Sequence, residues 1–227
     1  MAAKAKGLSI SEKSIIDYLG RKATYSLTKP SRKNFKRNQT AVGGIDQQWL
    51  ADLADMQALS RKNKGTKYIL TVIDVLSKYA WAFRVKNNAG PEMKNPFELL
   101  FQISNPPKPE KLQTDAGKEI LNKEVQKFLK SYGVLHFVSH SDKIAAVVER
   151  FNRTLKTKIW TYFIAKQRNF YIDKLQDFVK SYNHSVHRMI GIRPADVREE
   201  DQDRIWSRLY GKNLHRPTKP SVVGKMA

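Results

Sequence analysis

WLADLADMQALSRKNKGTKYILTVIDVLSKYAWAFRV, residues 49–85, decides the fold of this chain. Its two apolar parts, residues 49–59 and 68–85, are separated by the polar run SRKNKGTK. Short apolar runs bounded by turn residues are typical of β-strands, so we predict three strands here. The second and third should be antiparallel and turn near Ser77 to Tyr79. The aliphatic content of Tyr68 to Val75 predicts a central strand that is buried on both faces.

Helices and strands alternate after this stretch. We predict a helix at PFELLFQI, a strand at KLQTD, a helix at KEILNKEVQKFLKSYG with Gly133 as its stop, and a strand at VLHFVS. A long helix should follow at about 145–165, a second at about 171–182, and a short one near Pro194. Strands that are followed by alternating strands and helices indicate an α/β fold, a five-stranded mixed sheet flanked by helices.

Charge is the strongest global signal. The 227 residues include 42 Lys and Arg against 21 Asp and Glu, a formal net charge of +21. Such an excess favours a polyanionic partner, and nucleic acid fits better than an anionic membrane because no basic amphipathic membrane helix occurs. No apolar run reaches transmembrane length. The absence of cysteine excludes disulfides and Cys-containing zinc sites.

The basic residues suggest three parts: a basic N-terminal arm (1–44), a core (45–200) and a C-terminal basic tail (201–227). In the arm, Ser11 can cap a short helix that ends near Gly20. The run KPSRKNFKRNQ that follows is rich in charge and holds one large apolar residue, Phe35. It can lie along DNA phosphates, act as a nuclear localisation signal or serve as a solvated linker, and the sequence leaves these three open.

Three acids on separate elements could hold a metal ion. Asp52 lies in the first strand, Asp115 ends the strand KLQTD, and Glu149 lies near the start of the long helix; 62 and 33 residues separate them (115 − 52 − 1 and 149 − 115 − 1). Carboxylates are ligands for hard cations such as Mg²⁺. Asp55 and Asp74 compete with Asp52, and spacing alone leaves the choice open. Strand alternation turns Asp55 to the other face, and Asp74 fits a buried structural acid that bonds to the Ser77 turn.

The long helix carries cations beside its acid. Glu149, Arg153 and Lys156 share one face, which fits a metal ligand followed by a track for DNA phosphates. An exposed helix with ordinary ion pairs would show the same pattern. His184 and His187 form an HxxH, for which a structural role is favoured over zinc because no cysteine or second histidine pair lies nearby.

Five motifs in register resemble the catalytic core of retroviral-type integrases: WLAD, TVIDVLSKYAW, LQTDAGKE, VVERFNRTLK and YNHSVHRMIGIRPADV. The resemblance covers about residues 45–197 and is closest to integrases of Maverick/Polinton-type DNA transposons. In that group the leader YSLTKPSRKNFKRN and the segment GIDQQW also find counterparts. The resemblance implies an RNase H-like fold.

The resemblance also implies site residues. Asp52, Asp115 and Glu149 fall on the catalytic, metal-binding positions of the family, which hold two ions of Mg²⁺ or Mn²⁺. Asn152, Arg153 and Lys156 fall on positions that line the site or touch the DNA ends. Asp74 and His187 match recurrent positions that are not metal ligands. The preference for Asp52 over its competitors rests mostly on this resemblance.

The implied activity is that of a DNA integrase, a polynucleotidyl transferase that processes 3′ ends and joins element DNA to target DNA. Double-stranded DNA, a homo-oligomer and a nuclear location are expected, with no membrane. Two alternatives remain: an inactive, domesticated DNA-binding protein and an RNase H-like nuclease. No Cys-containing zinc domain is present, and no SH3-like or chromo domain pattern follows Val197. The spacing before Glu149 is two residues shorter than in retroviral integrases, and the loop 139–145 lacks Gly and Pro.

Overall fold

The computed structural model describes residues 11, 14, 18, 41–87, 90–103, 108–115, 122–139 and 146–211. The chain divides into two units, Met1–Arg37 and Asn38–Ala227. In the first unit Ser14 and Tyr18 are helical, and the Ser14 amide donates to Ser11 Oγ at 3.2 Å. This contact confirms the predicted cap, whereas Gly20 and the run KPSRKNFKRNQ lie outside the described residues.

The second unit contains a sheet, helices and short 3₁₀ turns. Its strands are β1 (Gln48–Asp55), β2 (Tyr68–Asp74), β3 (Ala80–Val85), β4 (Lys111–Asp115) and β5 (Leu135–Ser139). Its α-helices are α3 (Gly90–Ile103), α4 (Lys123–Ser131), α5 (Ala146–Lys166), α6 (Leu175–Asn183) and α7 (Gln202–Tyr210). The 3₁₀ turns are η2 (Gln57–Lys62), η3 (Pro194–Asp196) and η4 (Glu199–Asp201). All five predicted strands are present.

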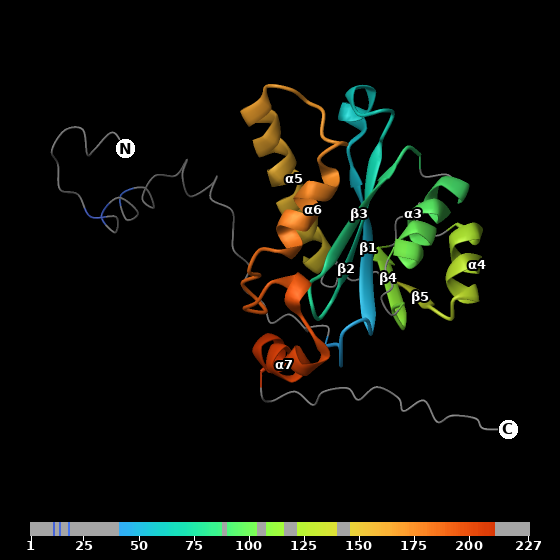
Figure 1. The fold of residues 1–227 in the computed structure, drawn as a ribbon, viewed down its shortest axis with the longest axis vertical. Helices are drawn as coiled ribbons and strands as arrows, with labels where there is room; N and C mark the ends of the chain where they lie inside the picture. Colours follow the sequence, from blue (N-terminus) through green and yellow to red (C-terminus); the bar gives the residue numbers. More distant parts are fainter. Residues whose placement is uncertain are drawn as a thin grey trace. The chain divides into compact units, whose positions relative to one another are not determined.

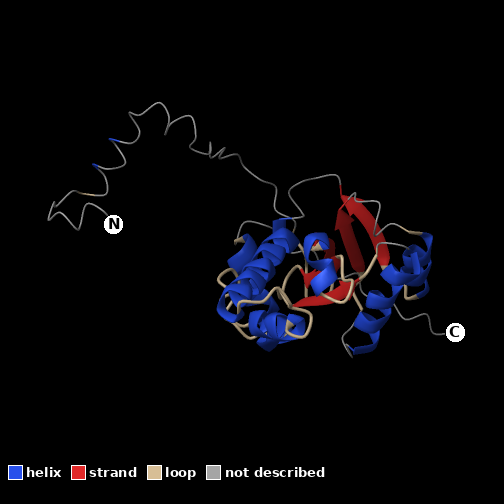
Figure 2. Ribbon diagram, turned by 90° about the horizontal axis from the view of Figure 1, so that it is seen from above, coloured by secondary structure: helices blue, strands red, loops and turns tan. Residues whose placement is uncertain are grey.

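The five strands form one mixed sheet in the order β3-β2-β1-β4-β5. β1 pairs antiparallel with β2, β2 pairs antiparallel with β3, and β4 lies parallel to both β1 and β5. The β2–β3 turn closes through the Asp74 amide, which donates to Tyr79 O at 2.9 Å, where the sequence predicted it. Helices α5 and α6 cover one face of the sheet, and α3 and α4 cover the other (Figures 1 and 2). The predicted five-stranded mixed α/β sheet is therefore confirmed.

Each face of the sheet has its own hydrophobic cluster. Leu50 and Ala54 of β1 pack in the cluster that includes α5, α6 and α7, whereas Trp49 and Ala51 pack in the cluster that includes α3 and α4. Successive side chains of a strand point to opposite faces, so this division fixes the direction of every β1 side chain. Asp52 shares the α5 face with Leu50 and Ala54.

β1 ends earlier than predicted. The Asp55 carboxylate accepts the Gln57 amide at 2.8 Å, and residues 57–62, the first three of which were predicted as strand, form η2. An Asp that bonds to the amide two residues on forms a local turn, which competes with continued sheet pairing. Four other elements also differ in detail. α3 begins at Gly90, six residues before the predicted start at Pro96, and α4 begins at Lys123 rather than at Lys118. α6 begins at Leu175 rather than near 171, and the turn at Pro194 is a 3₁₀ turn of three residues.

The C-terminal end of α4 matches the prediction, whereas its start lies later than predicted because Asn122 has an extended backbone. Asn122 Oδ1 accepts the Val125 amide at 2.8 Å and caps the helix start. Gly133 has φ +71°, the left-handed conformation that ends helices at low cost when no Cβ is present. Residues 118–121 of the predicted helix lie outside the described residues.

Side-chain amides attach the helical layer to the sheet. Asn183 of α6 bonds to both backbone groups of Ala80: its Oδ1 accepts from the amide at 3.0 Å and its Nδ2 donates to the carbonyl at 2.8 Å. Gln176 Nε2 donates to Ala82 O at 2.8 Å. Since β3 lies at the edge of the sheet, α6 satisfies backbone groups that would otherwise be open for pairing with another strand.

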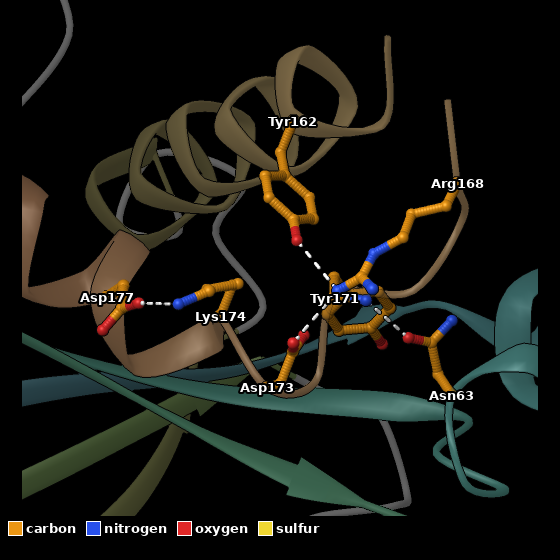
Figure 3. Close-up of polar contacts among 7 residues, drawn as sticks. All are labelled: Asn63, Tyr162, Arg168, Tyr171, Asp173, Lys174 and Asp177. Carbon is orange, nitrogen blue, oxygen red and sulfur yellow. Dashed lines mark hydrogen bonds and ion pairs between the residues drawn. The ribbon is translucent and has the colours of Figure 1, made fainter. Parts of the chain in front are cut away.

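A second link joins the turn after η2 to the segment between α5 and α6 (Figure 3). Asn63 is fully buried; its Oδ1 accepts the Tyr171 amide at 2.8 Å, and its Nδ2 donates to Asn169 O at 3.0 Å. Beside it, Arg168 donates to Tyr162 Oη and to Asp173 Oδ2. These contacts fix the end of α5 and the start of the following turn.

The packed body continues past residue 200. Ile205 and Trp206 of α7 are buried in the cluster on the α5 face. At least residues 202–210 therefore pack with the body, beyond the point at which the sequence interpretation begins a tail. Among the described residues, no helix is both long enough and apolar enough to span a bilayer.

Candidate functional site

Asp52 is positioned at the centre of the site by two hydrogen bonds. Its Oδ1 accepts the amide of Leu53 at 2.8 Å, and its Oδ2 accepts Asn152 Nδ2 at 2.6 Å. The side chain is half-buried, and burial is the main cause that raises its pKa above the ordinary value of 3.8. The two hydrogen bonds oppose this rise, as expected for contacts that favour the ionised form.

Asn152 ties Asp52 to a third element. The Asn152 side chain projects from α5, is 9% exposed, and its Oδ1 accepts Thr71 Oγ1 at 2.7 Å. Thr71 lies opposite Asp52 in the β1–β2 pairing, and its hydroxyl is also 3.2 Å from Asp52 O. β1, β2 and α5 therefore meet in one polar chain within an otherwise apolar layer.

Asp115 lies beside Asp52. In the parallel pairing of β1 with β4 the last matched residues are Ala51 and Thr114, so Asp52 and Asp115 follow at the next position of each strand. Asp115 is exposed at the end of β4, and its charge contributes to the raised pKa of Asp52. The structure thus brings two of the three predicted ligands together where the parallel pairing of β1 with β4 ends, at the carboxyl end of β4.

The α5 residues reach this pair to different degrees. The charge of Lys156 lowers the pKa of Asp52, so its ammonium acts on the same site. Glu149 and Arg153 are exposed on the helix. Among the described residues no group of three or more acids, His or Cys is arranged to hold a metal, so Glu149 is not brought together with the two aspartates. The loop 140–145, which enters α5, lies outside the described residues.

The donor chemistry that is present fits a hard cation. Asp52 and Asp115 offer carboxylate oxygens, which Mg²⁺ and Mn²⁺ prefer. A cation would offset the repulsion that raises the pKa of Asp52. The Asn152 and Leu53 contacts leave lone pairs on both Asp52 oxygens. Asp52 and Asp115 can therefore share a divalent ion.

The competing acids take other roles. Asp55 is exposed and caps its own turn. Asp74 is 1% exposed and accepts the amides of Leu76, Ser77 and Asp46. This confirms its structural role at the Ser77 turn. Burial, and after it the charge of Asp46, raises the pKa of Asp74 to about 6.

The two histidines do not form a metal site within the described chain. His184 is exposed and lies 2.9 Å from Lys180 O through Nδ1. His187 is half-buried, and burial followed by the charges of Lys78 and Arg150 lowers its pKa to about 4. Thr71 was missed by the sequence interpretation; its only sequence signal is a hydroxyl inside an aliphatic strand.

Comparison with known proteins agrees with this geometry. Residues 45–144 match the model of the integrase core domain, a span that contains Asp52 and Asp115 and ends before Glu149. The chain is 34% identical over 146 residues to an uncharacterised transposon-derived protein of Caenorhabditis elegans, covering 64% of this chain and 51% of that protein. The chain thus spans about half the length of this curated relative.

Solved structures share the fold at low identity. The HTLV-2 integrase catalytic core domain in complex with magnesium aligns with a TM-score of 0.55 at 19% identity, covering 70% of this chain and 99% of that one. A chain of the simian T-cell lymphotropic virus intasome in complex with PP2A regulatory subunit B56 gamma aligns with a TM-score of 0.61 at 18% identity, covering 99% and 76%. Residues 45–144 therefore match the integrase core domain, and the body that contains them has the RNase H-like fold of the retroviral integrase catalytic core.

Proposed function

We propose that this protein is a metal-dependent DNA integrase that processes the 3′ ends of an element and joins them to target DNA. One observation carries the proposal: Asp52 and Asp115 lie side by side on the α5 face, within reach of the Lys156 charge. The match to the integrase core domain supports the reaction class. The transposon-derived relative supports a mobile element as its source, and we propose one of the Maverick/Polinton type.

In this proposal Asp52, Asp115 and Glu149 hold the divalent ions, Mg²⁺ or Mn²⁺. Bound there, such ions supply Lewis-acid stabilisation of charge on the attacking and leaving oxygens. Asn152 keeps the Asp52 carboxylate in one orientation. Arg153 and Lys156 lie one and two turns beyond Glu149 and hold DNA phosphates next to the acids. Asn152 is nearly buried, which favours the site-lining role over the DNA contact that the resemblance also allowed.

The proposed reaction has two steps, the hydrolysis of one phosphodiester and the exchange of another. In end processing, a water oxygen bonds to phosphorus, the bond between phosphorus and the 3′ oxygen breaks, and that oxygen takes a proton. In joining, the freed 3′ hydroxyl loses its proton and attacks a target phosphodiester, which releases a target 3′ hydroxyl. No energy source is required because the number of phosphodiester bonds is unchanged in the joining step.

The proposed partners follow from charge and from the reaction. A net charge of +21 suits a duplex polyanion, and joining two ends to one target suits a homo-oligomer. Both structural neighbours are described as assemblies, a trimeric form and an intasome. We propose a nuclear location because the DNA substrate lies there in a cell with a nucleus.

The decisive experiment incubates the protein with Mg²⁺ or Mn²⁺, an oligonucleotide that carries the element's own terminal repeat, and a plasmid target. We expect joined products from the wild type and none from Asp52→Asn, Asp115→Asn or Glu149→Gln. Asp55→Asn is the matched control: it makes the same chemical change three residues away on the other face of β1 and should keep joining. Duplex binding should survive in all four variants because it rests on distributed cations.

The two alternatives give different products. Cleavage without joined products would favour an RNase H-like nuclease. Duplex binding with neither cleavage nor joining would favour an inactive, domesticated DNA-binding protein. If the Asp52→Asn variant still joined DNA ends, the assignment of Asp52 as a metal ligand would be wrong.

A further inference from the structure

A second cavity lies beside the proposed site, on another side of α5. It encloses about 410 Å³ between the β2–β3 turn, the first half of α5 and the segment after α6. Its wall includes four cationic side chains and no Asp or Glu: Lys78, Arg150, Lys158 and Arg188. Its volume lies in the range of about 300–1,000 Å³ that is usual for small-molecule sites.

No carboxylate in the wall balances the positive charge of this cavity. Within the described part of the chain, none of the four cations forms a salt bridge. Lys78 is only 7% exposed, and its Nζ donates to Val75 O at 2.6 Å. Burial lowers the pKa of Lys78 to about 8, the charge of Asp74 opposes this, and the charge of Arg150 adds to it. Asp74 therefore offsets part of the Lys78 charge, and the other three cations leave the wall positive, so the cavity suits an anion.

One wall of the cavity is aromatic. The rings of Phe151 and Tyr182 lie 4.7 Å apart between centroids, and Tyr182 meets the His187 ring at 6.1 Å and 75°. Phe151 is only 1% exposed and backs the Tyr182 ring, so Tyr182 and His187, which are partly buried, are the rings of this wall that can meet a ligand. Ile73 and Val147 also line the cavity. A bare phosphate would use the cations but leave this wall unused.

We propose that this cavity binds one unpaired nucleotide, with its phosphate among Lys78, Arg150 and Arg188 and its base against the Tyr182 and His187 rings, which Phe151 supports from the core. Cationic groups that track phosphates beside aromatic rings that stack bases are the general means of binding unpaired nucleotides. A paired base of a duplex cannot enter an enclosed space of this kind without leaving its stack.

The source of the nucleotide follows from α5. Arg150 and Lys158 belong to the same helix as Glu149 and Arg153, and Arg150 is the residue next to Glu149. A DNA end at the acids therefore passes close to the cavity, and an overhanging strand could place a nucleotide in it. This source rests on the proposed integrase function, whereas the cavity's preference for a nucleotide does not.

The test compares three probes on the full chain. The first is a blunt duplex, the second is the same duplex with a short 5′ overhang that carries 2-aminopurine, and the third is free dAMP. We expect the wild type to bind the overhang duplex at least about fivefold more tightly than the blunt one, which is the low end of base–aromatic stacking. The 2-aminopurine fluorescence should be quenched on binding.

Lys78→Gly is the main variant and has a matched control. Lys78 has φ +62°, which Gly adopts freely, so the change removes the ammonium without backbone strain. Lys64 has φ +53°, is exposed and does not line the cavity, so Lys64→Gly makes the same change elsewhere. We expect Lys78→Gly and Arg188→Gln to bind the overhang duplex no more tightly than the blunt duplex. Lys64→Gly should keep the wild-type preference for the overhang duplex. Thermal unfolding with and without dAMP should show stabilisation of the wild type that Lys78→Gly lacks.

Each outcome decides the proposal. Tighter binding of the overhang duplex than of the blunt duplex supports the nucleotide site with DNA as the source of the nucleotide. Stabilisation by dAMP without this difference in affinity supports the site with a free nucleotide as its ligand. Equal binding of both duplexes together with no effect of dAMP overturns it, even where joining activity is intact. If neither duplex binds, the integrase proposal fails and the dAMP result alone decides the cavity.

Discussion

Asn152 Nδ2 donates a hydrogen bond of 2.6 Å to Asp52 Oδ2 across 100 residues of sequence. The direction of this amide is set by the Asp52 carboxylate, which can only accept, so the Asn152 NH₂ faces it. Thr71 Oγ1 then donates to Asn152 Oδ1 at 2.7 Å and ties the amide to β2. Asn152 therefore orients the carboxylate that we propose as a metal ligand, and Thr71 holds Asn152 in place.

Thr71→Val should separate positioning from stability. The change keeps the side-chain shape and removes the hydroxyl, so we expect a loss of about 1 kcal/mol in the free energy of unfolding. Joining should slow by about 10–100-fold, the range seen when groups that orient metal ligands are removed. Single-turnover joining and denaturant unfolding measure the two effects. Thr71→Ser, which keeps the hydroxyl, should restore the rate; a Thr71→Val protein that joins at the wild-type rate would contradict the positioning role.

Much of this site follows from local patterns. Strand alternation alone turns Asp55 away from Asp52, and the two β1 neighbours Leu50 and Ala54 confirm the face. The burial of Asp74 was predictable because the acid interrupts an aliphatic strand and is followed by a Ser that turns the chain. Both predictions depend on contacts within a few residues of each other.

The remaining features depend on register between distant segments. No local pattern shows that Thr71 faces Asn152, since 81 residues separate them and the contact requires the β1–β2 pairing and the α5 docking together. The cavity beside α5 is likewise built from three segments. The sequence interpretation also placed Ile205 and Trp206 in a tail. The α7 segment is short and charged, and its few apolar residues do not show by themselves which part of the fold they pack against.

The pH dependence of stability should report on Asp46 and Asp74. The folded pKa of Asp74, about 6, exceeds its ordinary value of 3.8, so between these values the folded chain keeps a proton that the unfolded chain releases. The stability that this group contributes therefore falls as pH rises from about 4 to about 6. Asp46→Asn removes the second-largest cause of the shift and suits the positive φ of +58° at this position.

We expect Asp46→Asn to lower the pKa of Asp74 and to raise stability at neutral pH relative to the wild type. Carboxyl NMR titration measures the pKa, and urea unfolding at several pH values measures the slope. The two proteins should converge in stability below the ordinary Asp pKa of 3.8, where Asp74 is protonated in both folded and unfolded chains. An unchanged Asp74 titration would exclude Asp46 as a cause.

Lys156→Gln should change both the site and DNA binding. Its charge lowers the pKa of Asp52, so removing it should raise that pKa further and shift the pH at which joining begins upward. If Lys156 contacts one phosphate, the slope of log affinity against log salt should fall by about one. Lys127→Gln is the control, because Lys127 is exposed on α4, which packs on the other face of the sheet. An equal effect of both variants would show that only net charge matters.

Asn183→Ala should be the most destabilising of these changes. It removes the partners of both Ala80 backbone groups in a buried position, and each such group costs about 1–3 kcal/mol when it is left unsatisfied. We expect a loss of about 2–4 kcal/mol in the free energy of unfolding, measured by urea denaturation. Asn169→Ala, at an exposed side chain, should change it by less than about 0.5 kcal/mol. Asn183→Asp tests the mechanism, because it keeps an acceptor for the Ala80 amide but offers no donor to the Ala80 carbonyl and buries a charge. A wild-type stability for Asn183→Asp would show that α6 does not hold the edge strand through this amide.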